Sequence, residues 1–321
     1  MFKNIKGRFP AAGFLAVAGL LISPLAVAVG GGDLRTFHPD GTMDEGDVQD
    51  SYRADLVMYV AGNQFMVMED LVNAFLEKNP DIESVYVATL PPGKLLKEHI
   101  LSQGRVLGEK TSKHPDLFAS VNLGHLQKLE SKSRMDAFQT YIHNKLTLMV
   151  KEGNPQDIQG VKDLTRDDLV KYFPNPETEG IFIFYGSQML KDAGIYDEVV
   201  GKECRGCWSI PGETYFTKVH HRETPNGIEA GEVDAGIVWN SEVAYAKKQG
   251  RPIDGVDIPS PLNQAPRVGY AMGMLKDARN QYNAMRFMAF LGTDKAQGIY
   301  EAYGFKKATD EELKLKPIPT D

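Results

Sequence analysis

Two adjacent histidines and an arginine form the most concentrated group of reactive side chains in this sequence. His220, His221 and Arg222 stand in the stretch TKVHHRETP, just before Thr224-Pro225, where a helix is predicted to begin. Arginine carries a permanent charge on a planar fork that suits a carboxylate or an oxyanion, and a histidine could donate a further hydrogen bond. The stretch therefore favours a negatively charged guest. A solvated loop with one histidine tied to a backbone carbonyl is the plainer alternative.

A metal site is the second chemistry that these residues allow. Imidazole nitrogens and carboxylates are common ligands of transition metals, so His220 and His221 could surround a cation together with Glu177 and Glu179. Adjacent histidines in an extended segment point to opposite faces, so only one of them is expected to serve a single site.

The two cysteines, Cys204 and Cys207, form a C-x-x-C pair followed by Trp208. In an oxidising compartment this pair predicts a small disulfide loop. The tryptophan disfavours a c-type haem, which needs histidine there. A zinc site that adds His220 lacks a fourth ligand at zinc-finger spacing, and a redox role has little support outside a thioredoxin-like pattern.

Catalytic signatures are missing from the sequence. It contains no G-x-S-x-G elbow, no H-E-x-x-H helix, no Walker A loop and no G-x-G-x-x-G after a strand. Glu223 beside His221 could suggest acid–base chemistry, but sequence proximity is weak evidence for it. We therefore expect no enzyme and no cofactor, with a hydrolase kept as an alternative.

The first 28 residues have the organisation of a secretory signal peptide, with an uncleaved membrane anchor as the alternative. Lys3, Lys6 and Arg8 precede a short apolar region, and Ala26-Val27-Ala28 forms an A-x-A cleavage signature. Cleavage there removes three positive charges and takes the formal net charge from -7 to -10. We therefore expect an acidic protein in the periplasm, with no nucleic acid as partner, because phosphates favour a basic surface.

Apolar runs alternate with amphipathic segments from Asp55 onward. Short apolar strands are predicted at 55–62, 84–90 and 116–121, and each precedes residues with helical spacing. Further strands are predicted at 144–150 and 234–240, and two helices follow the turn-rich passage after Ala246. This order predicts an α/β fold with mostly parallel sheets covered by helices on both faces. Residues 29–53 are interpreted as an N-terminal extension of turns and exposed segments.

Four stretches of the chain stand out together: HPDLFASVN (114–122), PNPETEG (174–180), IEAGEVDAGIVWNSEVA (228–244) and FMAFLGTDKAQGIYEAYGF (287–305). With these stretches in this order, the chain resembles the class II periplasmic solute-binding proteins of the molybdate-binding type, which serve ABC transporters. The resemblance covers nearly all of the chain after the signal segment.

This resemblance implies two α/β lobes joined by two hinge crossings, with a small ligand between them. The first lobe is expected at 54–143 plus 247–321 and the second at 144–246. In such folds, ligands lie outside the carboxyl ends of strands, near helix N-termini. That rule selects Asn63, Gln64, Pro92, Gly93, Thr178 and Glu179, and the resemblance adds His220, His221, Arg222 and Trp239. Thr178 and Thr224 are also expected to cap helices, and Trp239 could simply pack in the core.

Together these features predict a monomeric periplasmic protein that captures a small anionic solute, an oxyanion or a carboxylate, for an ABC-type permease. Metal or metal-chelate binding and an accessory or sensory role are the alternatives. Asn63 and Gln64 replace the hydroxyl donors typical of molybdate pockets, and two prolines stand in the second loop. The ligand, the membrane partner and the redox state of the cysteines are therefore left open.

Overall fold

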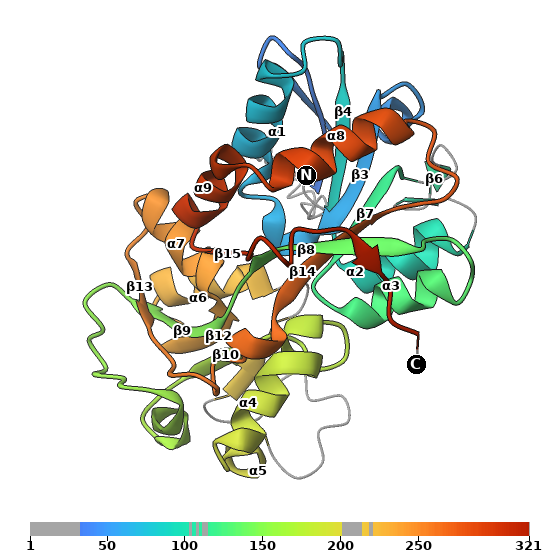
Figure 1. Ribbon diagram of the computed structural model, residues 1–321. Helices are drawn as coiled ribbons and strands as arrows, with labels where there is room; N and C mark the ends of the chain where they lie inside the picture. Colours follow the sequence, from blue (N-terminus) through green and yellow to red (C-terminus); the bar gives the residue numbers. More distant parts are fainter. Residues whose placement is uncertain are drawn as a thin grey trace, which may run out of the picture. The chain divides into compact units, whose positions relative to one another are not determined.

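The structure is a computed structural model that describes residues 33–102, 105–106, 109–110, 115–200, 214–217 and 221–320 (Figure 1). For residues 105–106, 109–110 and 221 it describes the backbone alone. The predicted signal peptide 1–28, the predicted disulfide of Cys204 and Cys207, and His220 lie outside the described residues. Within them, no helix combines the length and the apolar character needed to span a membrane.

Nine of the described strands form one large sheet, in the order β15-β8-β14-β7-β3-β4-β1-β2, with β16 also paired to β8. These strands are β1 (Leu34–Phe37), β2 (Met43–Glu45), β3 (Leu56–Ala61), β4 (Val85–Leu90), β7 (Leu117–Ser120), β8 (Ala137–His143), β14 (Gly269–Met274), β15 (Lys306–Lys307) and β16 (Lys316–Pro317). A separate pair consists of β5 (Arg105–Val106) and β6 (Glu109–Lys110).

Alternate residues of the central strand β3 face two different apolar clusters. Leu56, Met58 and Val60 belong to the same cluster as the buried residues of α1 and α8, whereas Val57 and Tyr59 belong to the cluster of α3. This period of two is what a strand covered by helices on both faces requires. The helical segments around the large sheet are η2 (Val48–Tyr52), η3 (Gly62–Gln64), α1 (Met68–Glu77), α2 (Pro92–Lys94), η4 (Leu95–Ile100), α3 (Leu123–Glu130), α8 (Gln281–Leu291) and α9 (Asp294–Ala302).

Five further strands form a small sheet in the order β11-β10-β12-β9-β13. Met149 of β9 and Val238 of β12 pack in one cluster with residues of α6 and α7, while Leu148 and Ile237 belong to the cluster that holds η6 and α4. Its elements are β9 (Leu146–Lys151), η5 (Val161–Thr165), β10 (Lys171–Phe173), η6 (Ile181–Gly186), α4 (Ser187–Asp192), α5 (Tyr196–Val199), β11 (Thr214–Phe216), η7 (His221–Glu223), α6 (Thr224–Glu229), β12 (Ala235–Trp239), α7 (Asn240–Lys248) and β13 (Ile253–Val256).

Both sheets are mixed, so the expectation of mostly parallel sheets was wrong in this detail. Parallel pairing joins β3 to β4 and β7, and β10 to β11 and β12. The remaining neighbours pair antiparallel, among them β14 with β7 and β8, and β9 with β12 and β13. Strands that arrive from the other sheet, or from the ends of the chain, need no helical crossover and can therefore pair antiparallel.

The chain passes between the sheets twice, from β8 to β9 and from β13 to β14, the second time through η8 (Ala265–Arg267). Residues 247–321 were expected in the first lobe, but β13 pairs with β9 in the small sheet. The prolines around β13 had indicated a turn-rich segment. Ile253 is the one fully buried residue of the four in β13, so the strand shows little periodicity. The wider division into lobes stays a prediction.

The predicted N-terminal extension adds two strands to the large sheet. All four residues of β1 are buried, and β1 pairs antiparallel with β4 on one side and β2 on the other. The interpretation of residues 34–37 as part of an exposed segment was therefore wrong. The sequence LRTF alternates apolar and polar residues over too short a run to stand out beside the glycine and acidic residues around it.

A glycine in the middle of β14 offers a test of core packing. A Cβ at Gly273 would lie 2.5 Å from the backbone oxygen of Ala137 and 2.4 Å from the sulfur of Met135. Gly273→Ala is therefore expected to lower the free energy of unfolding by about 1–3 kcal/mol through overpacking. Gly298→Ala is the matched control, because this helical glycine has no atom within 4 Å of its Cβ position. The control should stabilise the protein by about 0.5–1 kcal/mol in urea unfolding, and equal effects of the two substitutions would contradict the packing.

Buried His99 predicts a pH dependence of stability. It is 1% exposed, packs edge-on against Tyr59 at 6.2 Å, and neither ring nitrogen has a hydrogen-bond partner in the described part of the chain. Burial, with a smaller contribution from the Lys94 charge, lowers the pKa of His99 to about 4.

Between pH about 6.5 and 4 the unfolded state therefore binds a proton that the folded state does not, and stability falls as the pH is lowered. His99→Leu should reduce this slope in urea titrations at pH 7, 6 and 5. An unchanged slope would mean that His99 titrates normally in the folded protein.

Candidate functional site

The first candidate loop is the short helical turn η3, which follows β3 directly. Gln64 is fully buried there: its Nε2 donates to the Tyr141 hydroxyl at 2.8 Å, and the Tyr300 hydroxyl donates to its Oε1 at 3.0 Å. Both ends of the amide are thus held by tyrosines of the large sheet's own core. Gln64 positions the loop, and its predicted contact with a ligand finds no support in this geometry.

The neighbouring Asn63 belongs to a polar network at the junction of the two sheets. Its Nδ2 donates to the hydroxyl of Tyr270, which also accepts from Asn144 Nδ2 at 3.4 Å. Asn144 lies where the chain first crosses between the sheets, and it donates to Ser241 Oγ of α7 at 3.0 Å. All four side chains are buried. The network therefore connects the first loop, the first crossing and a helix of the small sheet.

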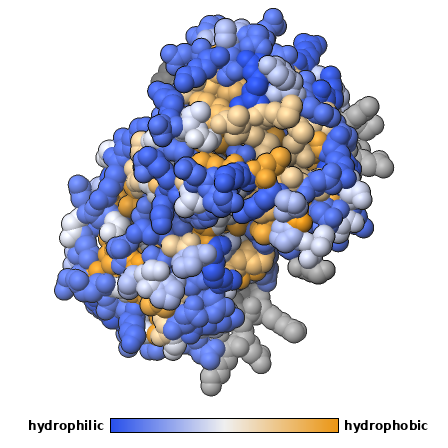
Figure 2. Space-filling model, in the orientation of Figure 1, coloured by the Kyte–Doolittle hydropathy of each residue, from blue (hydrophilic) through white to orange (hydrophobic). Residues whose placement is uncertain are grey.

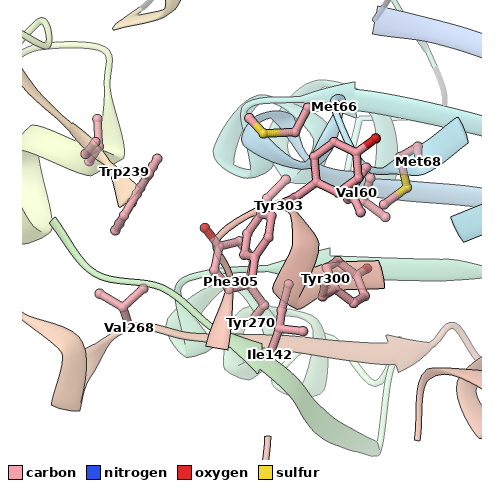
Figure 3. Packing of buried hydrophobic residues seen from close by; sticks show 14 of the residues in the cluster. Val60, Met66, Met68, Ile142, Trp239, Val268, Tyr270, Tyr300, Tyr303 and Phe305 are labelled. Carbon is pink, nitrogen blue, oxygen red and sulfur yellow. The ribbon is translucent and has the colours of Figure 1, made fainter. Parts of the chain in front are cut away.

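Aromatic rings surround this network. Tyr270 packs edge-on against Phe305 at 5.7 Å, and Phe305 packs against Tyr300 at 5.5 Å (Figure 3). Burial raises the pKa of Tyr270, so its hydroxyl remains protonated. The adjacent Gly304 has φ +78, and its carbonyl accepts from Asn240 Nδ2 of α7 at 2.8 Å. The predicted YGF motif at residues 303–305 thus packs against the small sheet.

Arg222 reaches from the small sheet to the first loop of the large sheet. Its Nη2 donates to the backbone oxygen of Gly62, and its Nη1 pairs with a carboxylate oxygen of Asp33 at 2.9 Å. The guanidinium lies 4.1 Å from the centre of the Phe65 ring. A Cβ at Gly62 would stand 3.2 Å from Nη2, so glycine leaves room for this approach. Of the predicted ligand residues, Arg222 thus reaches the loop that carries Asn63.

The loop at residues 177–180 differs from its prediction. Glu179 is buried and accepts from the backbone N–H of Asn175 at 2.9 Å and from the hydroxyl of Thr217, so it braces the small sheet. Thr178 is exposed and does not cap a helix, because η6 begins after Gly180 without a side-chain cap. Thr224 was also expected to cap, but it is the first residue of α6, one position too late to do so.

The second loop, after β4, lies near a histidine that the sequence did not suggest. Pro92 and Gly93 are partly exposed, and a Cβ at Gly93 would lie 3.6 Å from Nε2 of His125. The other ring nitrogen of His125 is 2.8 Å from the hydroxyl of Ser120, at the end of β7. Burial lowers the pKa of His125, which favours the neutral ring.

Trp239, at the end of β12, is a core residue. It is 3% exposed and packs edge-on against Tyr185 of η6 at 5.5 Å. The Tyr185 hydroxyl donates to the backbone oxygen of Val121 at 2.9 Å and so bonds the small sheet to the end of β7. Burial raises the pKa of Tyr185 to about 12. Trp239 therefore supports a contact between the sheets through its neighbour.

The predicted metal site is not assembled by the described residues. His221 is described only as backbone, Glu177 is exposed, and Glu179 is engaged in the small sheet. Among the described side chains, no group of three or more His, Cys, Asp or Glu could hold an ion. His220, Cys204 and Cys207 lie outside this search.

Tyr270, Asn144 and Asp33 are residues of the junction that sequence reasoning missed. Tyr270 sits in an apolar strand pattern, VGYAMGML, that predicts only core. Asn63 and Tyr270 are 207 positions apart in the chain, and no local pattern links them. Asn144 was the first residue of the predicted strand 144–150, and nothing in the sequence marked it as a residue of the junction.

Two comparisons of the sequence identify related proteins. The model of a family described as bacterial extracellular solute-binding protein matches residues 56–306. YvgL of Bacillus subtilis (strain 168), named as a candidate ABC transporter substrate-binding lipoprotein, is 24% identical over 164 residues, which are 51% of this chain and 56% of the relative. The chain therefore spans just over half the length of that curated relative.

Solved structures confirm the fold class. The periplasmic molybdate-binding protein of Azotobacter vinelandii has a TM-score of 0.61 at 19% identity, covering 79% of this chain and 100% of its own. Iron-bound HitA of Pseudomonas aeruginosa has a TM-score of 0.55 at 18% identity, covering 80% of this chain and 91% of its own. Since one binds an oxyanion and the other iron, the shared fold does not name a ligand.

The polar network at the junction is testable through the Tyr270 hydroxyl. Tyr270→Phe leaves the ring in place but removes the acceptor of Asn63 and Asn144, which are then buried without that partner. We expect the free energy of unfolding to fall by about 1–3 kcal/mol in denaturant titrations. Tyr282→Phe, at a 69% exposed tyrosine, is the control and should change nothing measurable. A Tyr270→Phe protein as stable as the wild type would contradict the network.

Proposed function

The chain belongs to the family of bacterial extracellular solute-binding proteins, and on that premise we propose that it captures a small anionic solute between its two lobes. The solute is an oxyanion or a carboxylate, and the residue that carries the proposal is Arg222. The protein delivers its solute unchanged to an ABC-type permease. The match of the family model over residues 56–306 and the name of the Bacillus subtilis relative support this role.

The position of Arg222 supports an anionic guest. Its guanidinium extends from the segment before α6 to the loop after β3, with Gly62 and Phe65 on the far side. A permanently charged fork at the meeting point of two lobes is suited to an anion that both lobes must contact. The molybdate-binding relative from Azotobacter vinelandii is consistent with this chemistry.

Asp33 also supports an anionic guest, because its carboxylate already forms an ion pair with Arg222. Its Oδ1 lies 2.9 Å from Arg222 Nη1, and the two side chains are 15% and 27% exposed. A pair this sheltered is screened less than a surface ion pair. The chain thus supplies an internal carboxylate in the place proposed for the guest, and a solute anion would compete with it for the guanidinium.

The two crossings between the sheets can serve as the hinge that capture of a solute requires. A guest favours the closed arrangement only if it makes contacts there that the open one lacks. Residues from both lobes must therefore touch the guest. Arg222 and the first loop are suited to this, because they already meet where the two lobes join. Hinge closure around a solute is a known way for a two-lobed protein to present a recognisable form to a membrane partner.

The location we propose is the periplasm, reached by cleavage of the signal peptide at residues 1–28. The family description, extracellular solute-binding, supports export of the protein. N-terminal sequencing of the exported protein tests the cleavage site, and a mature chain that begins at residue 29 is expected. A mature chain that retained Met1 would reject cleavage.

Titration calorimetry with molybdate, sulfate, phosphate, small carboxylates and divalent metals tests the proposed ligand class. An anion should bind the wild type, and Arg222→Ala should weaken it at least about tenfold, because a hydrogen bond to a charged group contributes about 1.5–3 kcal/mol. Asp33→Asn should strengthen binding a few-fold, since the competing carboxylate is gone.

Two controls separate charge from geometry and from folding. Arg222→Lys keeps the charge without the planar fork and should give an intermediate affinity. Arg53→Gln removes an exposed arginine elsewhere and should leave binding unchanged. Anion binding that survives Arg222→Ala in a folded protein would remove Arg222 from the site. Heat from metals alone would favour the cation alternative.

A further inference from the structure

A cavity of about 370 Å³ lies beside the junction of the two sheets, and none of the predicted ligand residues lines it. This volume falls within the usual range of small-molecule pockets and exceeds what a bare tetrahedral oxyanion needs. The large sheet contributes Val121, Thr140 and Glu312, the small sheet Phe184 and Tyr185, and the second crossing Arg267.

The position of the cavity makes it sensitive to movement of the sheets. The Tyr185 hydroxyl bonds the small sheet to Val121 of the large one, and both residues line the cavity. Arg267 and Pro266 come from η8, in the second crossing. A molecule held here would touch both sheets and the segment that joins them. Its contacts would therefore differ between open and closed arrangements.

Arg267 supplies a positive charge that no carboxylate neutralises within the described residues. Its Nη1 donates to the neutral amide oxygen of Gln264 at 2.7 Å, and its guanidinium lies 5.7 Å from the centre of the Tyr185 ring. The salt bridges of the described residues do not include it. Its remaining N–H groups can donate hydrogen bonds to the two oxygens of one carboxylate.

Glu312, the carboxylate among the residues that line the cavity, is hydrogen-bonded through both of its oxygens. Nδ1 of His143 lies 3.0 Å from the backbone oxygen of Val268 and must donate to it, while Nε2 lies 3.0 Å from Oε1 of Glu312. The other oxygen of Glu312 accepts from the backbone N–H of Thr309 at 2.9 Å and from its hydroxyl at 3.0 Å. Both carboxylate oxygens are thus occupied, whereas Arg267 is a charged group of the lining that still has N–H donors to offer.

The remaining walls are apolar with a few donors. Phe184 is 39% exposed, although most large apolar side chains are buried here, and Phe138 and Leu123 add further apolar surface. In the view of Figure 2, hydrophobic surface lies in patches between hydrophilic areas. Neither Thr140 Oγ1 nor Asn122 Nδ2 forms a hydrogen bond among the described residues, so both are available as donors. Aromatic walls with one guanidinium suit a flat apolar body that ends in a carboxylate.

We propose that this cavity is a second ligand site, for a small aromatic carboxylate, in which Arg267 binds the carboxylate and Phe184 packs on the ring. The occupant bridges the sheets beside the Tyr185–Val121 bond and so favours the closed arrangement. This site is separate from the one proposed at Arg222, and neither requires the other.

Benzoate and 4-hydroxybenzoate are the probes, with benzamide as the uncharged analogue of the same shape. Chemical shift changes in the full chain should show benzoate binding, with benzamide at least tenfold weaker. Arg267→Gln should weaken benzoate at least tenfold, and Phe184→Ala should weaken benzoate and benzamide alike. Arg53→Gln, an exposed arginine outside the cavity, should have no effect.

The Arg222→Ala protein distinguishes the two proposals. Benzoate binding that persists there but is lost in Arg267→Gln supports the second site, even if no oxyanion binds the wild type. Benzoate binding that is lost in Arg222→Ala and kept in Arg267→Gln assigns the carboxylate to the other site and overturns the inference. Equal affinity for benzoate and benzamide also overturns it, since the charge would then play no part.

For closure, small-angle scattering with saturating benzoate should show a smaller radius of gyration than the free protein. Tyr185→Phe removes the bond to Val121 but keeps the ring, and it should reduce this compaction while benzoate still binds. Benzoate bound without any change in the radius of gyration would reject the effect on closure.

Discussion

The hydroxyl of Tyr270 is the point on which the junction of the two sheets depends. Tyr270 stands near the start of β14, just after the second crossing, and it accepts hydrogen bonds from Asn63 and from Asn144 of the first crossing. A buried amide without a partner costs roughly 1–3 kcal/mol, so this one oxygen holds both crossings and the first loop in a single arrangement. Gln64 is held by the hydroxyls of Tyr141 and Tyr300 and so fixes the position of the same loop.

Around this fixed centre, the contacts between the sheets are of a more separable kind. Arg222 meets Gly62 and Asp33, and Tyr185 meets the backbone of Val121, each through one or two bonds at partly buried groups. Lys248 of α7 lies 3.8 Å from the ring centre of Tyr303. Contacts of this kind are individually weaker than the buried network at Tyr270. The buried network at Tyr270 is thus the firmest connection between the two sheets, and the contacts around it are weaker.

The sequence predicted what local periodicity can encode. The spacing of Leu71, Val72 and Phe75 places α1, and the same reasoning finds α8, α9 and the buried strand β3. It could not find β1 or β13, which are short and stand among glycines, acidic residues and prolines that indicate turns. Strand direction was also beyond it, because pairing between distant segments decides that.

The candidate site shows the same division. Asn63 was found because its position after a strand is a local property, and Arg222 was found by its residue type and by the family resemblance; the structure brings both to one loop. Glu179 and Gln64 were selected by the strand-end rule and Trp239 by the resemblance, yet each is engaged inside its own sheet. Whether a polar group at a strand end faces a guest or a neighbouring strand depends on tertiary partners such as Tyr300 and Thr217, which no local pattern reveals.

The outer strands of the two sheets have a bearing on behaviour at high concentration. β2 ends the large sheet with the exposed carboxylates of Asp44 and Glu45, and β13 ends the small sheet with Asp254 paired to Lys247 and prolines nearby. Charges and prolines at an edge prevent a strand of another copy from adding to the sheet. At these two margins, the short and charged strands oppose aggregation through β-strand addition.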